Sequence, residues 1–151
     1  MIDVMSPLAG RVLPINQAGD PVFADQTVGP GVAIEPEPQW VVVTAPVAGR
    51  LAALQPHSFA LETPDGTGVL VHLGIDTVKL QGRGFGLIAA QGDTVAQGDA
   101  IVEWDPSTIA APATASTVLV VALDRPADSL AELATGRQVA AGDKLFSIPA
   151  P

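Results

Sequence analysis

Hydrophobic residues along this chain occur in short runs separated by glycine, proline and small polar residues. Valine, isoleucine, leucine and alanine dominate the runs, and 15 glycines and 14 prolines punctuate the chain. Short β-branched runs between turn residues are typical of a β-sandwich or barrel. The pattern therefore predicts strands at Arg11–Ile15, Val32–Ile34, Trp40–Thr44, Arg50–Leu54, Phe59–Thr63, Val69–Leu73, Ala100–Trp104, Val118–Leu123 and Lys144–Ile148.

Helix is expected to be sparse. Asp128–Gly136 begins with a residue suited to an N-cap, carries leucine and alanine at helical spacing, and ends in glycine, so it is predicted to be helical. Phe85–Ala90 is predicted to form one or two helical turns. The Ala, Thr and Pro content of Ser107–Ser116 indicates a long surface connection.

Two internal similarities indicate a duplicated β architecture within one domain, residues 1–151. Ser6–Leu13 resembles Ala45–Ala52, and Gln91–Ile101 resembles Thr135–Leu145. Each copy of the second pattern reads as a buried valine, a Gly-Asp turn and a strand. Glycine supplies the positive φ of such turns, and the aspartate side chain bonds nearby backbone amides.

The composition of the chain excludes several classes of function. Hydrophobic residues make up 48% of the chain, yet no run reaches the ~20 apolar residues of a membrane span, and no secretory signal is visible at the N-terminus. A cytoplasmic protein is therefore expected. The lack of cysteine excludes disulfides, thiolate metal sites and cysteine nucleophiles. A net charge of −9 repels phosphate backbones, so nucleic acid is not an expected partner, whereas a basic protein surface is compatible.

The chain has two histidines, His57 and His72, on either side of a predicted hairpin turn at Pro64–Gly68. His72 lies where an apolar strand is expected to end, just before Gly74 and Asp76. A hairpin loop of two or four residues would place both histidines on one face of the hairpin, whereas a five-residue loop would place them on opposite faces. The sequence leaves this register open.

Three chemical roles are open to this histidine pair. Each histidine could be a hydrogen-bonded structural residue. With Asp76, which could otherwise cap a turn or orient an imidazole, the pair could bind a metal. Alternatively, a neutral imidazole could accept a phosphoryl group while the second one hydrogen-bonds it. Gly82–Gly86 lacks the spacing of a nucleotide-binding loop and reads as a turn, so the phosphoryl donor would be another protein.

The segment Val71–Val78, with the sequence VHLGIDTV, resembles the active-site motif of the glucose-type enzyme IIA of the bacterial sugar phosphotransferase system. The similarity extends from Ser6 to about Ile148, with further matching segments in the family's order at Ser6–Gly10, Asp20–Ala24, Val28–Ile34, Ala45–Gly49, His57–Phe59 and Gly98–Asp99.

This resemblance implies an all-β fold, an antiparallel sandwich of the duplicated hybrid type with short helical segments. It implies that His72 accepts phosphate from the carrier protein HPr and passes it to a cysteine of an enzyme IIB. His57 would support transfer, and Asp76 would belong to the site. No cofactor is implied, and the membrane is contacted only through the sugar permease. Regulatory target proteins are also compatible. The implied docking surface consists of Pro21, Val22, Phe23, Val28, Leu70 and Val78.

The chain departs from the family at two positions near the site. Leu70 stands where an aromatic residue is common, and Gln55 stands where a threonine is common. Two other duplicated β folds are alternatives. A zinc metallopeptidase would use His72 and Asp76 but needs a His-x-His that the chain lacks. A biotinyl or lipoyl carrier needs a hairpin-tip lysine in a setting that neither Lys79 nor Lys144 has. A pure protein-interaction module is a third alternative.

Overall fold

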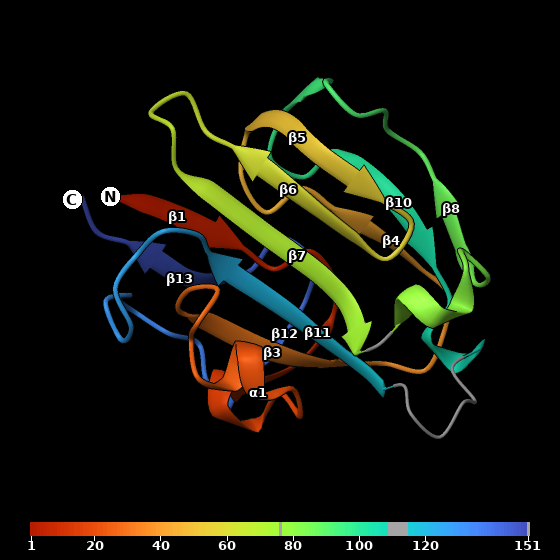
Figure 1. Ribbon diagram of the computed structural model, residues 1–151, viewed down its shortest axis with the longest axis horizontal. Helices are drawn as coiled ribbons and strands as arrows, with labels where there is room; N and C mark the ends of the chain where they lie inside the picture. Colours follow the sequence, from red (N-terminus) through yellow and green to blue (C-terminus); the bar gives the residue numbers. More distant parts are fainter. Residues whose placement is uncertain (76, 109–114, 151) are drawn as a thin grey trace.

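The computed structural model describes residues 1–75, 77–108 and 115–150, and antiparallel strands dominate it (Figure 1). The strands are β1 (Ile2–Met5), β2 (Gly10–Pro14), β3 (Gly31–Pro36), β4 (Val41–Thr44), β5 (Gly49–Gln55), β6 (Ser58–Glu62), β7 (Gly68–Ile75), β8 (Phe85–Leu87), β9 (Thr94–Val95), β10 (Ala100–Trp104), β11 (Ala115–Ala122), β12 (Gln138–Val139) and β13 (Lys144–Ile148). The helical segments are α1 (Pro21–Ala24) and the 3₁₀ turns η1 (Ile15–Gln17), η2 (Thr77–Leu80) and η3 (Pro106–Thr108). Every predicted strand is present, with ends that differ by a few residues.

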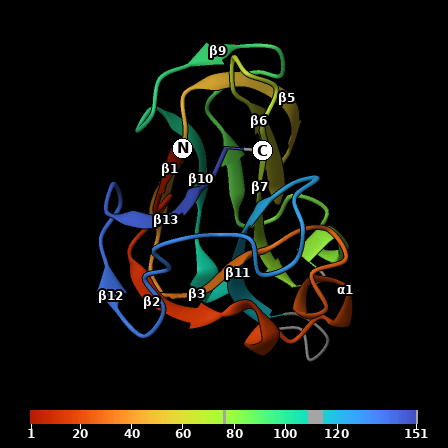
Figure 2. The ribbon, with the colours of Figure 1, turned by 90° about the vertical axis from the view of Figure 1, so that its left-hand side faces the viewer.

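The strands form one long curved sheet and two short ones that pack against its inner face. The long sheet has the order β12-β2-β3-β11-β7-β6-β5-β9, and the short sheets are β1-β13 and β4-β10-β8. The main core lies between these layers, and its largest fully buried side chains include Trp104, Phe59 and Phe146. Figure 2 shows α1 on the opposite, outer face of the long sheet. The predicted antiparallel β-sandwich is therefore confirmed.

The predicted duplication is visible in the hydrogen bonds. Gly98 N donates to Ala45 O and Ala45 N to Asp99 O, both at 2.9 Å. In the other half, Gly142 N donates to Ser6 O at 2.9 Å, and Ser6 N donates to Asp143 O. A second matching set joins the 92–93 turn to Leu51 and the 136–137 turn to Val12. The long sheet accordingly reads as two matching halves, β12-β2-β3-β11 and β9-β5-β6-β7.

Three of the four repeated turns are closed by an aspartate side chain. The carboxylates of Asp93, Asp99 and Asp143 accept from the backbone N–H three residues earlier, at 2.8 to 3.0 Å. The fourth turn has Arg137 at this position. There the corresponding amide, Ala134 N, donates to Leu145 O at 2.8 Å, so the turn leaves no amide for an aspartate to satisfy.

This difference predicts that alanine substitutions in these turns lower the thermal stability unequally. Asp99→Ala and Asp143→Ala each remove a charge-assisted hydrogen bond and are expected to lower Tm by about 2–4 °C. Arg137→Ala removes no such bond and serves as the matched control, with Tm expected to stay within about 1 °C of the parent value. Thermal unfolding followed by circular dichroism measures all three. Equal losses in the aspartate and arginine variants would contradict the assigned role of the carboxylates.

Both helix predictions are wrong, and tertiary pairing explains why. Within residues 128–136, Asp128 and Glu132 have φ of 59° and 55°, which a right-handed helix cannot accommodate. Ala131 instead forms a bridge with Ser147 of β13. The segment Phe85–Ala90 begins as β8, because Phe85 pairs with Trp104 in register and stacks on its ring at 5.7 Å. The turn predicted at Gly82–Gly86 is present at 82–84, but residues 85 and 86 belong to β8. Part of the predicted 107–116 connection lies outside the described residues.

The sequence pattern missed β1, β8, α1 and the two-residue strands β9 and β12. The single turn α1 is set by local polar chemistry rather than by an apolar stripe. Asp20 caps it by accepting from Val22 N at 2.9 Å, and proline occupies its first position. No residue of α1 is fully buried.

Candidate functional site

His72 projects from the outer face of the long sheet, within β7. The predicted strand ended at Leu73, but β7 continues through Gly74 to Ile75, so His72 lies inside a strand rather than at its end. Its cross-strand neighbours are Ser58 on β6 and Leu119 on β11. The side chain is half-buried. A rigid central strand therefore fixes the position of the imidazole.

The register of the β6–β7 hairpin differs from both of the face-sharing registers weighed above. Ser58, not His57, lies opposite His72, and the connecting loop has an odd number of residues. In a regular ladder this register would place His57 on the opposite face. His57, however, precedes β6 and lies in the turn after β5, where its carbonyl accepts from Leu73 N at 2.7 Å. The turn redirects the side chain, so the two rings meet because of this turn and not because of the hairpin register.

The two imidazoles and a phenyl ring form a compact cluster. The His57 and His72 ring centroids are 5.3 Å apart with an interplanar angle of 72°. Phe23 of α1 lies on another side of His72, with centroids 5.5 Å apart. Two other chain segments thus converge on His72.

The orientation of the His72 ring is set by the backbone two residues later. His72 Nδ1 lies 2.6 Å from Gly74 O. A carbonyl only accepts, so Nδ1 carries the proton and the neutral ring keeps its lone pair on Nε2. Gly74 has φ of 82°, a conformation that glycine adopts readily. The sequence analysis considered Asp76 as a residue that could orient an imidazole and missed the Gly74 carbonyl, although the His-x-Gly spacing was visible.

The chain beyond Gly74 is anchored by a buried hydroxyl. Thr77 is fully buried and its Oγ1 donates to Leu73 O at 2.6 Å. This bond ties the start of η2 back to β7, next to His72. Gln55, by contrast, is exposed at the end of β5.

The pKa of His57 lies below its ordinary value of 6.5, chiefly because burial disfavours the charged ring and secondarily because of the charge of His72. His57 is therefore neutral at pH 7. Since the folded protein binds this proton less readily than the unfolded chain, the contribution of His57 to stability is present above pH 6.5 and is lost as pH falls toward the lowered pKa.

We expect an NMR titration to give a His57 midpoint below 6.5. In His72→Gln the charge is lost while most of the burial remains, so the midpoint should rise without reaching 6.5. A complete return to 6.5 in the variant would make the His72 charge the main cause and contradict the assignment to burial.

The predicted docking residues lie in two groups around His72. Pro21 and Val22 are exposed on α1, and Val22 is 51% exposed. Phe23, Val28 and Leu70 are partly buried and pack together on the outer face of the sheet against a small cluster that includes Leu119 and Val121. Asp76 and the side chain of Val78 lie outside the described residues.

The duplicated halves differ at the site. Leu73 N donates to His57 O, and in the other half Ala122 N donates to Pro30 O at 2.8 Å. By this correspondence His57 matches Pro30, and His72, one residue before Leu73, matches Val121. The two imidazole rings thus belong to one half alone, and the corresponding place in the other half is apolar.

Within the described residues, no group of three or more His, Asp or Glu side chains is placed to hold a metal ion. The pair His57 and His72 supplies two nitrogens, fewer than the three protein ligands of a typical catalytic zinc site. Asp76, the third residue of the metal-binding hypothesis, lies outside the described residues.

Comparison with known proteins shows the family of the chain. Residues 2–127 match the family described as the phosphoenolpyruvate-dependent sugar phosphotransferase system, EIIA 1. The chain belongs to this family. Within this family, its relatives include glucose-type EIIA components. The glucose-specific EIIA component of Oceanobacillus iheyensis is 35% identical over 122 residues, which cover 80% of this chain and 73% of that protein.

Two further relatives differ in how much of their own length this EIIA chain covers. The glucose permease IIA of Mycoplasma capricolum superposes with a TM-score of 0.85 and 30% identity, covering 96% of this chain and 94% of the other. The N-acetylglucosamine-specific EIICBA component of Klebsiella pneumoniae is 36% identical over 148 residues, covering 96% of this chain but 22% of that protein. The EIIA chain thus spans less than a quarter of such multidomain relatives.

These comparisons give no support to a zinc metallopeptidase or a biotinyl or lipoyl carrier. In the part of the chain that the structure describes, no helix has the length and hydrophobicity needed to cross a membrane.

Proposed function

We propose that this EIIA protein carries its phosphoryl group on Nε2 of His72. The donor is the phosphohistidine of HPr, and the acceptor is a cysteine of an enzyme IIB that phosphorylates sugar during uptake. The observation that carries this proposal is the ring pair, in which Nδ1 of His72 is bound to Gly74 O and His57 lies 5.3 Å away.

The chemistry follows from the protonation of the two rings. The lone pair on His72 Nε2 attacks phosphorus, a P–N bond forms, and the P–N bond of the donor histidine breaks with its electron pair returning to the donor ring. The Gly74 carbonyl holds the proton on Nδ1 and stabilises the positive charge that develops on the His72 ring. Discharge reverses the step, with the cysteine thiolate of the enzyme IIB as nucleophile.

His57 supports transfer without holding the phosphoryl group. A neutral imidazole has one N–H, and from the adjacent ring position it can donate to a phosphoryl oxygen in the transition state. Its lowered pKa keeps it neutral, so it adds no positive charge that would hold the phosphate too tightly for onward transfer. We assign Asp76 to the same site by its position in the sequence motif.

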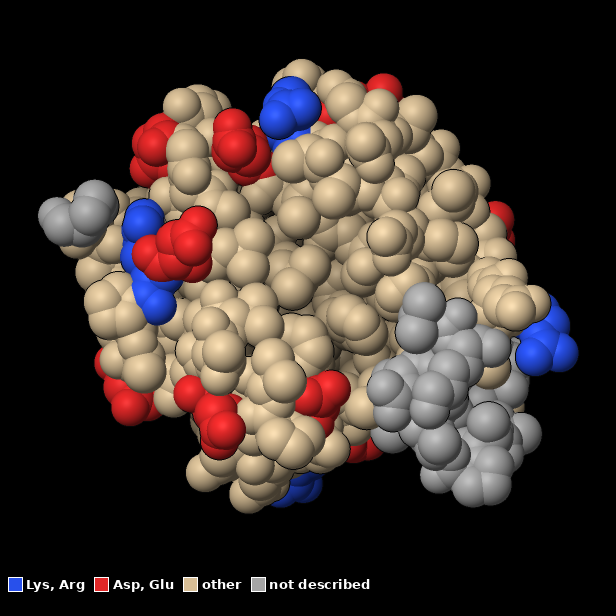
Figure 3. All heavy atoms as spheres, in the orientation of Figure 1, with Lys and Arg blue, Asp and Glu red and all other residues tan. Residues whose placement is uncertain are grey.

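The docking surface is formed by the apolar residues around His72, namely Pro21, Val22, Phe23, Val28, Leu70 and Val78. Figure 3 supports this role, because the centre of the face over β7 and β11 is free of coloured charged side chains, which gather nearer its margins. An uncharged centre allows close approach, and acidic residues at the margin favour a donor with a basic rim.

We further propose that residues 1–151 form a single enzyme IIA domain that works in the cytoplasm, needs no cofactor or metal, and reaches the membrane only through its permease. Relatives are named for glucose and for N-acetylglucosamine, so the sugar is assigned to the permease rather than to this domain. Regulatory target proteins would use the same face.

The proposal is tested by reconstitution. Phosphoenolpyruvate labelled with ³²P, enzyme I and HPr are incubated with the protein, and the expected result is one acid-labile, base-stable phosphate per chain. Omission of HPr should prevent labelling. Absence of label in the complete system, with a known EIIA labelled in parallel, would overturn the proposed function.

A further inference from the structure

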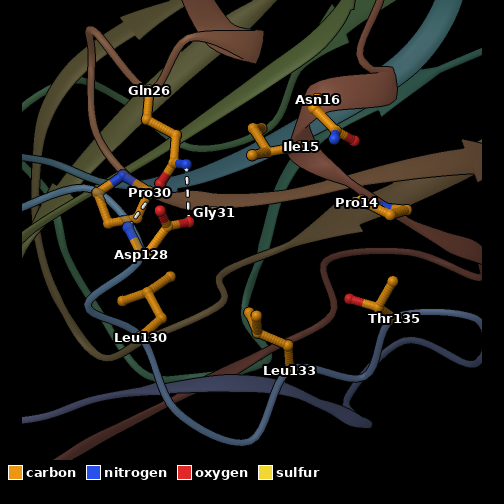
Figure 4. Close-up of a pocket in the computed structure, with 10 residues that line it drawn as sticks. All are labelled: Pro14, Ile15, Asn16, Gln26, Pro30, Gly31, Asp128, Leu130, Leu133 and Thr135. Atoms are coloured by element: carbon orange, nitrogen blue, oxygen red, sulfur yellow. Dashed lines mark hydrogen bonds between the residues drawn. The ribbon is translucent and has the colours of Figure 1, made fainter.

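Gln26 and Asp128 form a reciprocal hydrogen-bonded pair between segments 102 residues apart in the sequence. Gln26 Nε2 donates to Asp128 Oδ1 at 3.0 Å, and Asp128 N donates to Gln26 Oε1 at 2.9 Å (Figure 4). Both residues are non-glycine residues in the left-handed region, with φ of 57° and 59°. The two bonds therefore hold both backbones in an uncommon conformation.

Gln26 directly ends the turn that carries Phe23. Its backbone N–H donates to Phe23 O at 3.0 Å, and Thr27 N donates to Val22 O at 3.2 Å. A shift of Gln26 would therefore be transmitted to the residues that face His72.

Packing alone does not fix this segment. No residue of α1 is fully buried, and one helical turn has little stability of its own. A cavity of about 220 Å³ lies beside the Gln26–Asp128 pair and is lined also by Ile15, Pro30 and Leu130. Figure 4 shows the Gln26 and Asp128 side chains joined across one end of this cavity. The cavity takes the place of packed side chains that would otherwise hold the segment of Gln26.

We propose that Gln26 is a positioning residue for phosphoryl transfer, which acts with Asp128 to hold α1 so that Phe23 packs on His72. The inference rests on the proposed role of His72 in transfer. The pair would preorganise the docking surface, so its loss should weaken binding of the phosphodonor while leaving the chemical step intact.

The test is Gln26→Gly, which removes both hydrogen bonds and is compatible with positive φ. We expect the KM for phospho-HPr to rise about fivefold with kcat unchanged. The ring protons of His72 should also move in the NMR spectrum toward their positions in Phe23→Leu, because the ring current of Phe23 is displaced. Asp124→Gly is the matched control. It has φ of 56°, lies four residues before Asp128 in the sequence, and is expected to change neither quantity.

A conservative variant separates positioning from general destabilisation. Asp128→Asn keeps an oxygen acceptor for Gln26 and should retain the parent KM and His72 spectrum, whereas Asp128→Gly should shift both in the direction of Gln26→Gly. Unchanged His72 resonances in Gln26→Gly would overturn the inference, whatever the transfer assay shows. If the parent protein accepts no phosphate but the resonances move as expected, the proposed function fails and the positioning contact stands.

Discussion

Replacement of His72 by glutamine is expected to abolish phosphorylation by phospho-HPr. Glutamine has a similar volume and an amide that can bond Gly74 O, but it has no nucleophilic nitrogen. The loss in transfer rate should exceed about 1,000-fold, since we propose that His72 alone forms the P–N bond and that His57 only donates a hydrogen bond. Transfer from ³²P-labelled phosphoenolpyruvate through enzyme I and HPr measures it, and circular dichroism verifies that the variant is folded.

His57→Gln is the matched comparison, because it makes the same substitution at the neighbouring ring. This variant should still accept phosphate on His72 but pass it to the cysteine of an enzyme IIB about 100-fold more slowly, as expected for the loss of a positioned hydrogen-bond donor. Label retained by the His72 variant, or acceptance lost only in the His57 variant, would reverse the assigned roles.

Gly49→Ala and Gly10→Ala are expected to be strongly destabilising small substitutions in the long sheet. A methyl group at Gly49 would lie 2.3 Å from Glu62 O, and one at Gly10 would lie 2.4 Å from Glu35 O. These contacts are with the backbone of the neighbouring strand, so relief requires the strands to separate at equivalent places in the two halves. Each variant should lose about 3 kcal/mol.

Urea unfolding followed by tryptophan fluorescence measures this loss, because Trp104 is fully buried in the core. Gly86→Ala on β8 is the control. A methyl group there meets nothing closer than 3.6 Å, which is ordinary contact, and its midpoint should stay near that of the parent. Similar losses at Gly49 and Gly86 would show that strand propensity, rather than close approach of the strands, sets the cost.

The sequence predicted the elements that are defined by a hydrophobic run and missed those defined by pairing. β10 and β13 occupy the predicted residues because their side chains enter the core. Residues 128–136 carry a helical stripe, yet Asp128 bonds Gln26 and Ala131 pairs with Ser147, contacts with residues far away in the chain. Local helix propensity cannot predict such long-range contacts.

The candidate site shows the same division. The identity of the two histidines could be read from their motifs, and the structure brings their rings together. The way in which the two rings meet could not be predicted from the sequence. It depends on the turn that contains His57 and on the β6–β7 loop, residues 63–67, which has an odd number of residues. The Gly74 carbonyl was also missed, since backbone acceptors have no residue signature, although it decides which nitrogen of the neutral His72 ring keeps its lone pair.

The most direct test of the central claim is to locate the phosphoryl group. The protein is labelled with ¹⁵N in histidine, phosphorylated by HPr, and studied by ³¹P–¹⁵N NMR. The hydrogen bond from Nδ1 to Gly74 O predicts one phosphohistidine, at His72, with phosphorus bonded to Nε2. Phosphorus on Nδ1 of His72, or on either nitrogen of His57, would contradict it.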